Sequence, residues 1–569
     1  MTKKNGSQII WECILKENVD TVFGIPGGAT LPLYDAMLEY PVHHVHVRHE
    51  QGAAHMADGY ARATGRVGVA MATSGPGATN LVTGIATAFM DSSPIVCITG
   101  QVASPFIGYD AFQETDVTGV TLPITKHNYL VRDVNEINRV VREAFYVARS
   151  GRPGPVLIDI TKDAQQAEIE WEYDDTPIKL PGYMPDLSPS TADMQSASDL
   201  IRKAKRPVIL AGAGVMKSGA MQQVREFAEK TLTPVAVTLL GIGSVPASHT
   251  LNIGMMGMHG DPWVNKAIQE ADLLISMGMR FDDRVTGKMD EYAPKAKIIH
   301  FDIDASEINK NVKTDVALIG DLKETLVNFE PYTECREHEE WLDTINVWKE
   351  ESAKIDIQNR PHNGKLYPPH VVNDLRKYAD QDTILVTDVG QHQMWAAQYF
   401  PIEKPDHFLS SGGLGTMGFA LPAAIGAKFG QPEKEVWAIA GDGGFQMTQA
   451  ELSTCAQEGI KVNIAIINNG FLGMVRQWQE LFYDKRYAST PMGSPDFVKI
   501  AEAHGLTGIR VTKRSEVEAA IKKARETEGT VLIDFQVVEE DNVYPMVASG
   551  ARLDQMIHRP GPEGSEDHI

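Results

Sequence analysis

Short apolar runs bounded by glycine or proline recur along the chain and constrain its fold more than any other feature. Their apolarity is continuous rather than alternating, as a parallel strand covered on both faces requires. Amphipathic stretches of helical length separate many of them. The clearest runs are residues 67–73, 94–100, 155–160, 207–212, 273–278, 298–303, 383–389, 436–440 and 462–467. The pattern predicts repeated βα units, and hence doubly wound α/β domains with parallel sheets.

The length of the chain, 569 residues, is too great for one hydrophobic core and predicts about three to four domains. Two stretches read as linkers: 176–191 carries four prolines, and 330–369 is charged and irregular apart from a predicted surface helix at 339–354. These linkers divide the chain into three predicted domains, 1–175, 190–330 and 365–540, followed by a C-terminal tail at 541–569.

Composition narrows the class of protein. A formal net charge of −22 argues against nucleic acid as a partner, because binding a polyanion needs clustered Lys and Arg. Cys13, Cys97, Cys335 and Cys455 lie far apart and form no CxxC pair, which gives no support to a zinc site or a disulfide framework. No apolar run reaches the roughly 18 residues of a membrane span. A short polar start precedes a helical pattern at 8–17, so we expect no targeting peptide and a cytoplasmic protein.

The most specific chemical motif is Gly441-Asp442-Gly443-Gly444, paired with Asn468-Asn469. Each part follows a predicted strand, at the edge where open α/β sheets bind ligands. Glycines let the backbone approach a diphosphate, and a helix predicted to start near Gln446 directs its N–H groups at that anion. Asp442 and Asn469 supply oxygen ligands suited to a divalent cation. Either part alone also fits an ordinary turn, so the pairing carries the prediction.

This spacing resembles the fingerprint of the thiamine diphosphate-dependent enzymes, and the resemblance extends over nearly the whole chain. It implies pyrimidine-binding, FAD-binding and diphosphate-binding domains in that order. It also implies that Asp442, Asn469 and the backbone oxygen of Phe471 hold Mg²⁺, which binds the cofactor diphosphate. The other cofactor contacts implied in these segments are Gly441, Gly443, Gly444, Gly473 and Met474.

Glu50 stands at the start of an alanine-rich helical stretch, in the motif from Arg48 to Arg62. An isolated glutamate in such a place usually caps a helix. In the family that the chain resembles, the matching glutamate hydrogen-bonds a ring nitrogen of thiamine and promotes the imino tautomer that activates it. In that family glutamate and metal site face one another across subunits. The resemblance therefore implies a homodimer, or a tetramer built from it.

A third cluster runs from Ser411 to Phe419 and contains four glycines. By itself it reads as a strand-to-helix connection, with the helix expected at 421–427. In the family the residue matching Met417 wedges between the cofactor rings and holds them in a bent conformation. Gly415 belongs to the same implied site. Upstream, the segment implied to contact diphosphate and pyrimidine comprises Val389, Gly390, Gln391 and His392.

Two segments narrow the resemblance to the acetohydroxyacid synthase (acetolactate synthase) catalytic subunits. The first runs from Arg280 to Gly287; with two charges of each sign, it would by default be a solvated loop. The resemblance implies that Arg284 binds the acceptor carboxylate, a task that suits a planar guanidinium. The second runs from Gly470 to Gln479, where Trp478 is implied to favour 2-ketobutyrate over pyruvate as acceptor. A tryptophan at this helical spacing is otherwise more often core.

The implied reaction decarboxylates pyruvate and joins the two-carbon unit to pyruvate or 2-ketobutyrate, in branched-chain amino acid biosynthesis. Phe112, Gln113 and Met258 are implied to line the substrate pocket. The central domain is implied to bind FAD without net redox chemistry. Its own motif is incomplete, because Lys217 stands where a GxGxxG needs its third glycine. The implied FAD contacts are Arg152, Gly212, Gly214, Met258, His259, Gly278, Arg280, Asp302, Ile303 and Asp321.

Three other functions stay open at this point. A pyruvate oxidase or glyoxylate carboligase is disfavoured by Glu50 with Arg284 and Trp478. A dinucleotide-dependent dehydrogenase is disfavoured by the incomplete glycine motif, and an inactive homologue by the intact Glu50, Asp442 and Asn469. The sequence departs from the family at Ala103, Phe106 and Val547-Ala548-Ser549-Gly550, near the substrate channel and its lid. The family often has a small regulatory subunit, and nothing in the sequence identifies where it would dock.

Overall fold

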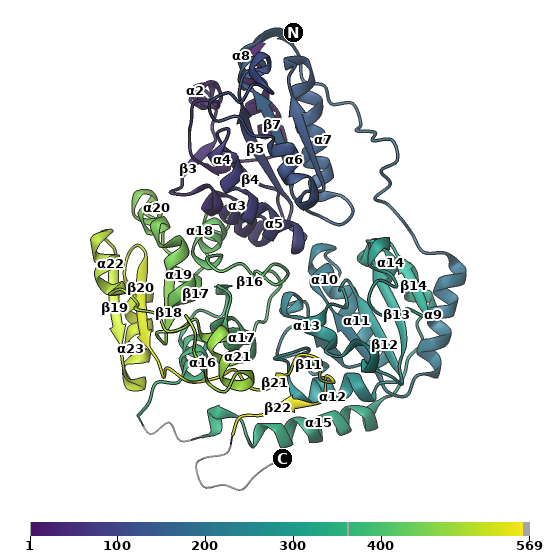
Figure 1. The fold of residues 1–569 in the computed structure, drawn as a ribbon. Helices are drawn as coiled ribbons and strands as arrows, with labels where there is room; N and C mark the ends of the chain where they lie inside the picture. The colour runs from purple at the N-terminus through teal and green to yellow at the C-terminus, as the bar shows by residue number, and fades with distance from the viewer. Residues whose placement is uncertain (1, 361–363, 561–569) are drawn as a thin grey trace.

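Three α/β domains, each built on a six-stranded parallel sheet, make up a computed structural model that describes residues 2–360 and 364–560 (Figure 1). The N-terminal domain lies at the top of Figure 1, the central domain at the right and the C-terminal domain at the left. The predicted fold class is therefore confirmed. Helices cover both faces of each sheet, which explains why the inner strands are apolar throughout.

The N-terminal sheet has the strand order β3-β2-β4-β5-β7-β6. Its strands are β2 (Thr21–Gly24), β3 (His43–His46), β4 (Gly68–Ala72), β5 (Ile95–Gln101), β6 (His127–Val131) and β7 (Val156–Thr161). Its helices are α1 (Gly6–Lys16), α2 (Leu31–Met37), α3 (Glu50–Thr64), α4 (Pro76–Asn80), α5 (Val82–Met90), α6 (Val117–Thr121), α7 (Ile137–Arg149) and α8 (Lys162–Gln166). A small antiparallel pair, β1 (Thr2–Asn5) with β8 (Glu168–Trp171), closes the domain.

The central sheet has the order β11-β10-β9-β12-β13-β14. Its strands are β9 (Pro207–Ala211), β10 (Val235–Val237), β11 (Asn252–Met255), β12 (Leu273–Met277), β13 (Lys297–Asp302) and β14 (Val316–Ile319). Its helices are α9 (Thr191–Lys203), α10 (Ala213–Lys217), α11 (Met221–Thr231), α12 (Pro262–Glu270), α13 (Asp283–Thr286) and α14 (Leu322–Phe329). Helix α15 (Glu339–Ala353) packs on this domain through α12, close to the helix expected at 339–354.

The C-terminal sheet has the order β16-β15-β17-β18-β20-β19. Its strands are β15 (Ile384–Thr387), β16 (Phe408–Ser410), β17 (Val436–Gly441), β18 (Asn463–Asn468), β19 (Thr507–Val511) and β20 (Val531–Gln536). Its helices are α16 (Pro368–Tyr378), α17 (Gln391–Tyr399), α18 (Ala420–Gly430), α19 (Asp442–Thr448), α20 (Leu452–Glu458), α21 (Gly473–Phe482), α22 (Phe497–Ala503) and α23 (Arg514–Glu526). The strand order reverses at β15, so a crevice opens between the carboxyl ends of β15 and β17.

The N-terminal and C-terminal domains share one apolar core, because α3 packs directly on α18. Glycine and alanine bring the two backbones together: a Cβ at Gly59 would stand 2.0 Å from the carbonyl oxygen of Ala423. A Cβ at Gly426 would stand 1.9 Å from the carbonyl oxygen of Met56. Substituting either glycine would push the helices apart. This contact fixes the position of Glu50, the first residue of α3, relative to the C-terminal sheet.

Residues 172–190, which join the N-terminal to the central domain, contain no helix or strand, as expected for a linker. The tail runs back across the molecule and forms a short antiparallel pair, β21 (Met546–Val547) with β22 (Met556–Ile557), against the central domain (Figure 1). Residues 561–569, the end of the expected tail, lie outside the described residues. Within the described part of the chain, every helix is too short or too polar to cross a bilayer.

Candidate active site

A narrow cavity of about 60 Å³ lies at the carboxyl ends of the C-terminal strands. The segments after β15, β17 and β18 converge on it, which is where the sequence places the diphosphate and metal ligands. The structure therefore brings thirteen predicted residues together. They are Val389, Gly390, Gln391, His392, Met417, Gly441, Asp442, Gly443, Gly444, Asn469, Phe471, Gly473 and Met474.

Asp442 is the first residue of α19, which begins four residues before the Gln446 start expected from the sequence. The glycines at 443 and 444 belong to the helix rather than to a preceding turn, so the first helical N–H groups stand beside the cavity. The buried Asp442 carboxylate accepts a hydrogen bond from the Ser494 hydroxyl at 2.6 Å. Burial raises its pKa, and the Ser494 hydroxyl and the backbone N–H of Asn469 act against this. A bound cation would stabilise the ionised form.

Asn469 offers its amide to the same cavity. Its Nδ2 donates to Oε1 of Gln391 at 3.2 Å, and its Oδ1 accepts from the backbone N–H of Phe471 at 3.2 Å. Gln391 in turn donates to Oε1 of Gln477 at 2.9 Å. This chain of amides fixes the rotamer of Asn469 and directs its oxygen. The carboxylate, amide and backbone oxygens of Asp442, Asn469 and Phe471 form the donor set that Mg²⁺ prefers, so the residues present fit that ion.

Glycines keep the cavity open, because side chains there would collide with its polar wall. A Cβ at Gly473 would stand 2.2 Å from Oε1 of Gln391, and one at Gly444 would stand 2.7 Å from Oδ2 of Asp388. A Cβ at Gly441 would stand 2.9 Å from Nδ1 of His392. The glycines thus allow a ligand to approach the backbone closely.

His392 gives an independent sign that the cavity receives a polar ligand. Its side chain is buried, and its Nε2 has no hydrogen-bond partner within the described structure. Burial lowers the pKa of His392 to about 3, so the ring is neutral near pH 7. An unpartnered buried nitrogen is costly unless a ligand pairs with it. Together with the glycine-lined backbone, this atom fits the diphosphate and pyrimidine of thiamine diphosphate.

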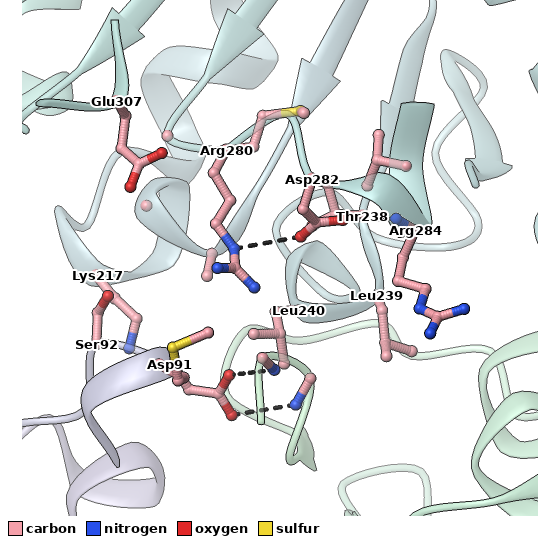
Figure 2. Close-up of a pocket in the computed structure, with 18 of the residues that line it drawn as sticks. Asp91, Ser92, Lys217, Thr238, Leu239, Leu240, Arg280, Asp282, Arg284 and Glu307 are labelled. Atoms are coloured by element: carbon pink, nitrogen blue, oxygen red, sulfur yellow. Dashed lines mark hydrogen bonds and ion pairs between the residues drawn. The ribbon is translucent and has the colours of Figure 1, made fainter. Parts of the chain in front are cut away.

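Two buried carboxylates hold the glycine-rich loop that carries Met417. Asp91 accepts hydrogen bonds from the backbone N–H groups of Gly412 at 3.1 Å and Gly413 at 2.6 Å (Figure 2). Asp388 accepts from the N–H of Gly418 at 2.8 Å. These hydrogen bonds fix the loop on both sides of Met417. The Met417 side chain lines both the small cavity and the larger one.

The larger cavity has a volume of about 920 Å³ and receives residues from all three domains. This volume is at the upper end of the roughly 300–1,000 Å³ typical of cofactor sites. Nine of the ten predicted FAD contacts line it: Arg152, Gly214, Met258, His259, Gly278, Arg280, Asp302, Ile303 and Asp321. Gly212 does not, because it packs against the end of β12, where its Cβ would stand 2.3 Å from the carbonyl oxygen of Gly278. Gly415, Arg284 and Trp478 also line this cavity.

Ion pairs fix most cations of the larger cavity. Arg280 pairs with Asp282 at 3.2 Å (Figure 2). Arg152 pairs with Asp304 at 3.1 Å and Glu307 at 2.9 Å. A cavity of this size, with fixed cations and apolar strand ends, fits a flavin dinucleotide.

Arg284 and Trp478 line the larger cavity, as Met417 does. Arg284 is exposed, and its closest carboxylate is that of Asp283 at 3.6 Å, so most of its guanidinium is free for a ligand. Trp478 lies on α21 against Phe482, with ring centroids 5.0 Å apart. It is half-buried rather than core, as expected for a residue that narrows a pocket.

The tail connects the two walls of this cavity. Val547 donates its backbone N–H to the carbonyl oxygen of Met258 at 2.8 Å, and Nδ1 of His259 lies 3.2 Å from the carbonyl oxygen of Pro545. Gln477, beside Trp478, binds the carbonyl oxygen of Val543 at 3.1 Å. The tail thereby spans the cavity wall between α21 and the 258–259 segment.

Glu50 is apart from both cavities of its own chain. Its buried carboxylate accepts a hydrogen bond from Nδ2 of Asn80 at 2.9 Å, and a Cβ at Gly77 would stand 3.2 Å from its Oε1. Gln113 lies nearby, against Gly75. Gln113 has a φ of 60°, and neighbouring Phe112 is 88% exposed. One chain thus separates the predicted substrate and pyrimidine residues of the N-terminal domain from the diphosphate cavity.

Several cavity residues escaped the sequence analysis. Trp395, Leu472 and Val475 line the small cavity, and Lys217, Asp91 and the segment 238–240 line the large one. The segment 238–240 follows β10 at the carboxyl edge of the central sheet, but this three-residue strand is too short to be recognised in the sequence.

Three parts of one family match the chain in order. Residues 4–120 match "Thiamine pyrophosphate enzyme, N-terminal TPP binding domain", and residues 194–329 match the central domain. Residues 388–535 match the C-terminal TPP binding domain. The chain therefore belongs to the thiamine pyrophosphate enzymes, the class that its three sheets and glycine-lined cavity define.

Within that class the chain belongs to the acetolactate synthases. It is 50% identical over 567 residues to an acetolactate synthase of Mycobacterium bovis, covering 97% of this chain and 91% of that protein. It is 51% identical over 562 residues to the acetolactate synthase large subunit of Corynebacterium glutamicum, covering 96% and 89%. The large subunit of Cyanidium caldarium is 47% identical over 571 residues, 97% of each chain. The predicted family is confirmed.

Proposed function

We propose that the chain decarboxylates pyruvate and transfers the remaining two-carbon unit to a second 2-keto acid, either pyruvate or 2-ketobutyrate. The products are 2-acetolactate and 2-aceto-2-hydroxybutyrate, intermediates of branched-chain amino acid biosynthesis. One observation carries this proposal: Met417 lies between a cavity with diphosphate and metal ligands and a larger cavity containing Arg284 and Trp478. The names of the relatives agree with it.

In the small cavity, Asp442, Asn469 and the backbone oxygen of Phe471 would hold Mg²⁺, and the ion would neutralise the charge of the cofactor diphosphate. The first N–H groups of α19 and the unpartnered Nε2 of His392 bind the remaining polar atoms. Bound thiamine diphosphate supplies an electron sink as carbon dioxide leaves the keto acid. Met417, which lines both cavities, would support the rings of the bound cofactor. The apolar side chains of Leu472, Met474 and Val475, which line the cavity beside its polar atoms, would exclude water from the reacting centre.

In the larger cavity, Arg284 binds the carboxylate of the acceptor keto acid with its free guanidinium N–H groups. Trp478 narrows the space beside it, so that the ethyl group of 2-ketobutyrate makes more apolar contact than the methyl group of pyruvate. The cavity residues at the ends of the central strands would hold FAD, which would have a structural role.

The active unit is a homodimer, because Glu50 and Gln113 lie apart from the small cavity of their own chain. Glu50 of a second copy completes that cavity and shares a proton with a cofactor ring nitrogen. Exposed apolar side chains near Gln113, among them Phe106 (58% exposed) and Phe112 (88%), support burial against another copy. Two dimers would form the tetramer expected from the resemblance.

We infer further that the enzyme is cytoplasmic and accepts a small regulatory subunit, since several relatives are named large subunits.

Product analysis tests the proposed reaction. Purified protein receives pyruvate and 2-ketobutyrate together, with and without thiamine diphosphate and Mg²⁺. We expect both acetohydroxy acids only when both cofactors are present, with acetohydroxybutyrate exceeding acetolactate. Acetyl phosphate with peroxide would indicate an oxidase instead, and the absence of any new carbon–carbon bond would refute the proposal.

A further inference from the structure

Lys217 is the one cation in the wall of the larger cavity whose charge no ion pair compensates, within the part of the chain that the structure describes. The other cations each have a carboxylate partner. Arg149 pairs with Glu17, Arg152 with Asp304 and Glu307, Arg280 with Asp282, and Arg284 with Asp283.

The carboxylates nearest to Lys217 are engaged elsewhere. Asp58 and Asp91 both pair with Arg62, at 2.7 and 2.9 Å, and Asp91 also binds two backbone N–H groups of the glycine-rich loop. Asp406 acts on Lys217 only at a distance beyond that of an ion pair. No acidic side chain is therefore available to neutralise the amine in place.

The surroundings of Lys217 make an uncompensated charge unfavourable. Its side chain is exposed and lines the cavity, where a ligand can reach it. Desolvation by the cavity wall, helped by the Arg62 guanidinium, lowers the pKa of Lys217 to about 8. The electrostatic potential at this position thus favours a bound anion. Such an anion would raise the pKa of the amine again and keep it protonated.

The position of Lys217 in the fold indicates which anion. It is the last residue of α10, the short helix that begins with Ala213 and Gly214 after β9 and has Gly212 as its N-cap. The start of this helix packs tightly against the end of β12, where a Cβ at Gly214 would stand 2.6 Å from the Cα of Gly278. In Figure 2, Lys217 lies beside Ser92, on the opposite side of the cavity from Arg284. It is therefore far from the place assigned to the acceptor carboxylate.

We propose that Lys217 binds the diphosphate of the flavin dinucleotide and so replaces, with a side-chain charge, the glycine-rich phosphate contact that this domain lacks. This rests on the proposed FAD site. The amine donates hydrogen bonds to phosphate oxygens, which would explain why it stands unpaired at a dinucleotide-binding strand end. Its contribution is to cofactor affinity rather than to the reaction itself.

Flavin fluorescence tests the assignment on the full chain. Apoprotein is titrated with FAD for wild type, Lys217→Met, Lys217→Arg and Lys313→Met; Lys313 is an exposed lysine of the same domain that does not line the cavity. Loss of a charged hydrogen bond predicts a roughly ten- to hundredfold weaker FAD affinity for Lys217→Met. Lys217→Arg should stay within a few-fold of wild type, and Lys313→Met should match it.

Two further measurements separate the alternatives. The thermal midpoint of the apoprotein should be the same in wild type and Lys217→Met, while the rise that FAD produces should shrink. ADP carries the same diphosphate without the flavin, so a Lys217 dependence seen for ADP but not for FAD would overturn the proposal. Equal FAD affinity of wild type and Lys217→Met would overturn it as well. A wild-type protein that does not bind FAD would instead refute the underlying flavin site.

Discussion

Glu451 accepts a hydrogen bond from the backbone N–H of His49 at 3.1 Å, immediately before Glu50. It also accepts from the N–H of Arg48 at 3.1 Å and from the hydroxyl of Thr454 at 2.7 Å. Glu451 belongs to the C-terminal domain, so one domain supplies the carboxylate that positions the start of α3 in another. Gly52 permits this contact, because a Cβ there would stand 2.5 Å from Oε1 of Glu451.

Replacing Glu451 by alanine leaves the part-buried N–H groups of Arg48 and His49 without their acceptor. We expect the free energy of unfolding to fall by about 1 to 2 kcal/mol, because a fully buried unsatisfied group costs about 1 to 3 kcal/mol and these two are only partly buried. Because α3 then loses its anchor beside Glu50, kcat should fall more than the KM for pyruvate rises. Urea unfolding and steady-state kinetics measure both effects. The exposed Glu433→Ala serves as control; equal behaviour of the two variants would contradict the prediction.

Gly473→Ala tests the close approach in the small cavity. The new Cβ would stand 2.2 Å from Oε1 of Gln391 and 2.8 Å from Nδ2 of Asn469, so it should displace the amides that direct the metal ligand. Overpacking of this kind predicts a roughly ten- to hundredfold weaker affinity for thiamine diphosphate with Mg²⁺. Calorimetric titration measures it. Gly493→Ala, where a Cβ meets nothing within 4 Å, should bind as wild type does.

Buried histidines should destabilise the protein in mild acid. Burial lowers the pKa of His55 to about 4, whereas in the unfolded chain it is about 6.5. Between these two pKa values, His55 is protonated in the unfolded chain but neutral in the folded protein. The contribution of the neutral, buried His55 to the free energy of unfolding is fully present above pH about 6.5, and it is lost as the pH falls toward 4. This one site contributes a slope of about 1.4 kcal/mol per pH unit within that window.

His55→Gln should reduce that acid sensitivity, although it lowers stability at pH 7 through lost packing. The measurement is the drop in the thermal midpoint between pH 6.5 and 4.5, which should be smaller than in wild type. His127→Gln, at an exposed position, should leave the drop unchanged. If the thermal midpoint of His55→Gln drops as much as that of wild type, groups other than His55 cause the loss of stability in acid.

Trp478→Leu should relax the choice of acceptor. Discrimination by one methylene in an apolar pocket is about 1 to 3 kcal/mol, so we expect the ratio of acetohydroxybutyrate to acetolactate to fall roughly tenfold or more. Product analysis with both keto acids present gives this ratio directly. Phe482→Leu changes the ring that packs on Trp478 without touching the cavity lining, and it should shift the ratio less. An unchanged ratio in Trp478→Leu would remove Trp478 from the specificity site.

The sequence predicts the small cavity well because its residues lie at the ends of long, continuously apolar strands. All nine apolar runs contain a strand whose ends fall within two residues of the predicted ones. Strands such as β3 and β10 escaped prediction, because three or four residues carry too little pattern. The predicted start of α19 is four residues late, because the N-cap Gly441 and two glycines in the first turn are typical of a loop.

Residues that act through contacts between distant segments could not be predicted from the sequence. Asp91 meets Gly412 although 321 residues separate them in the sequence, and Lys217 is recognised only after the ion pairs of its neighbours are known. The separation of Glu50 from the small cavity depends likewise on how whole domains pack. A sequence motif records which chemistry a segment can perform, but not which copy of the chain completes the site.

Mixing two inactive variants tests the central claim most directly, namely that the cavity at Asp442 performs the reaction only with Glu50 from a second copy. Glu50→Gln and Asp442→Ala are each expected to produce no acetolactate. Unfolded together in equal amounts and refolded, they form heterodimers with one intact site, and activity should return to about a quarter of wild type by random pairing. If the mixture stays inactive although heterodimers form, the two residues do not act across subunits and the account is wrong.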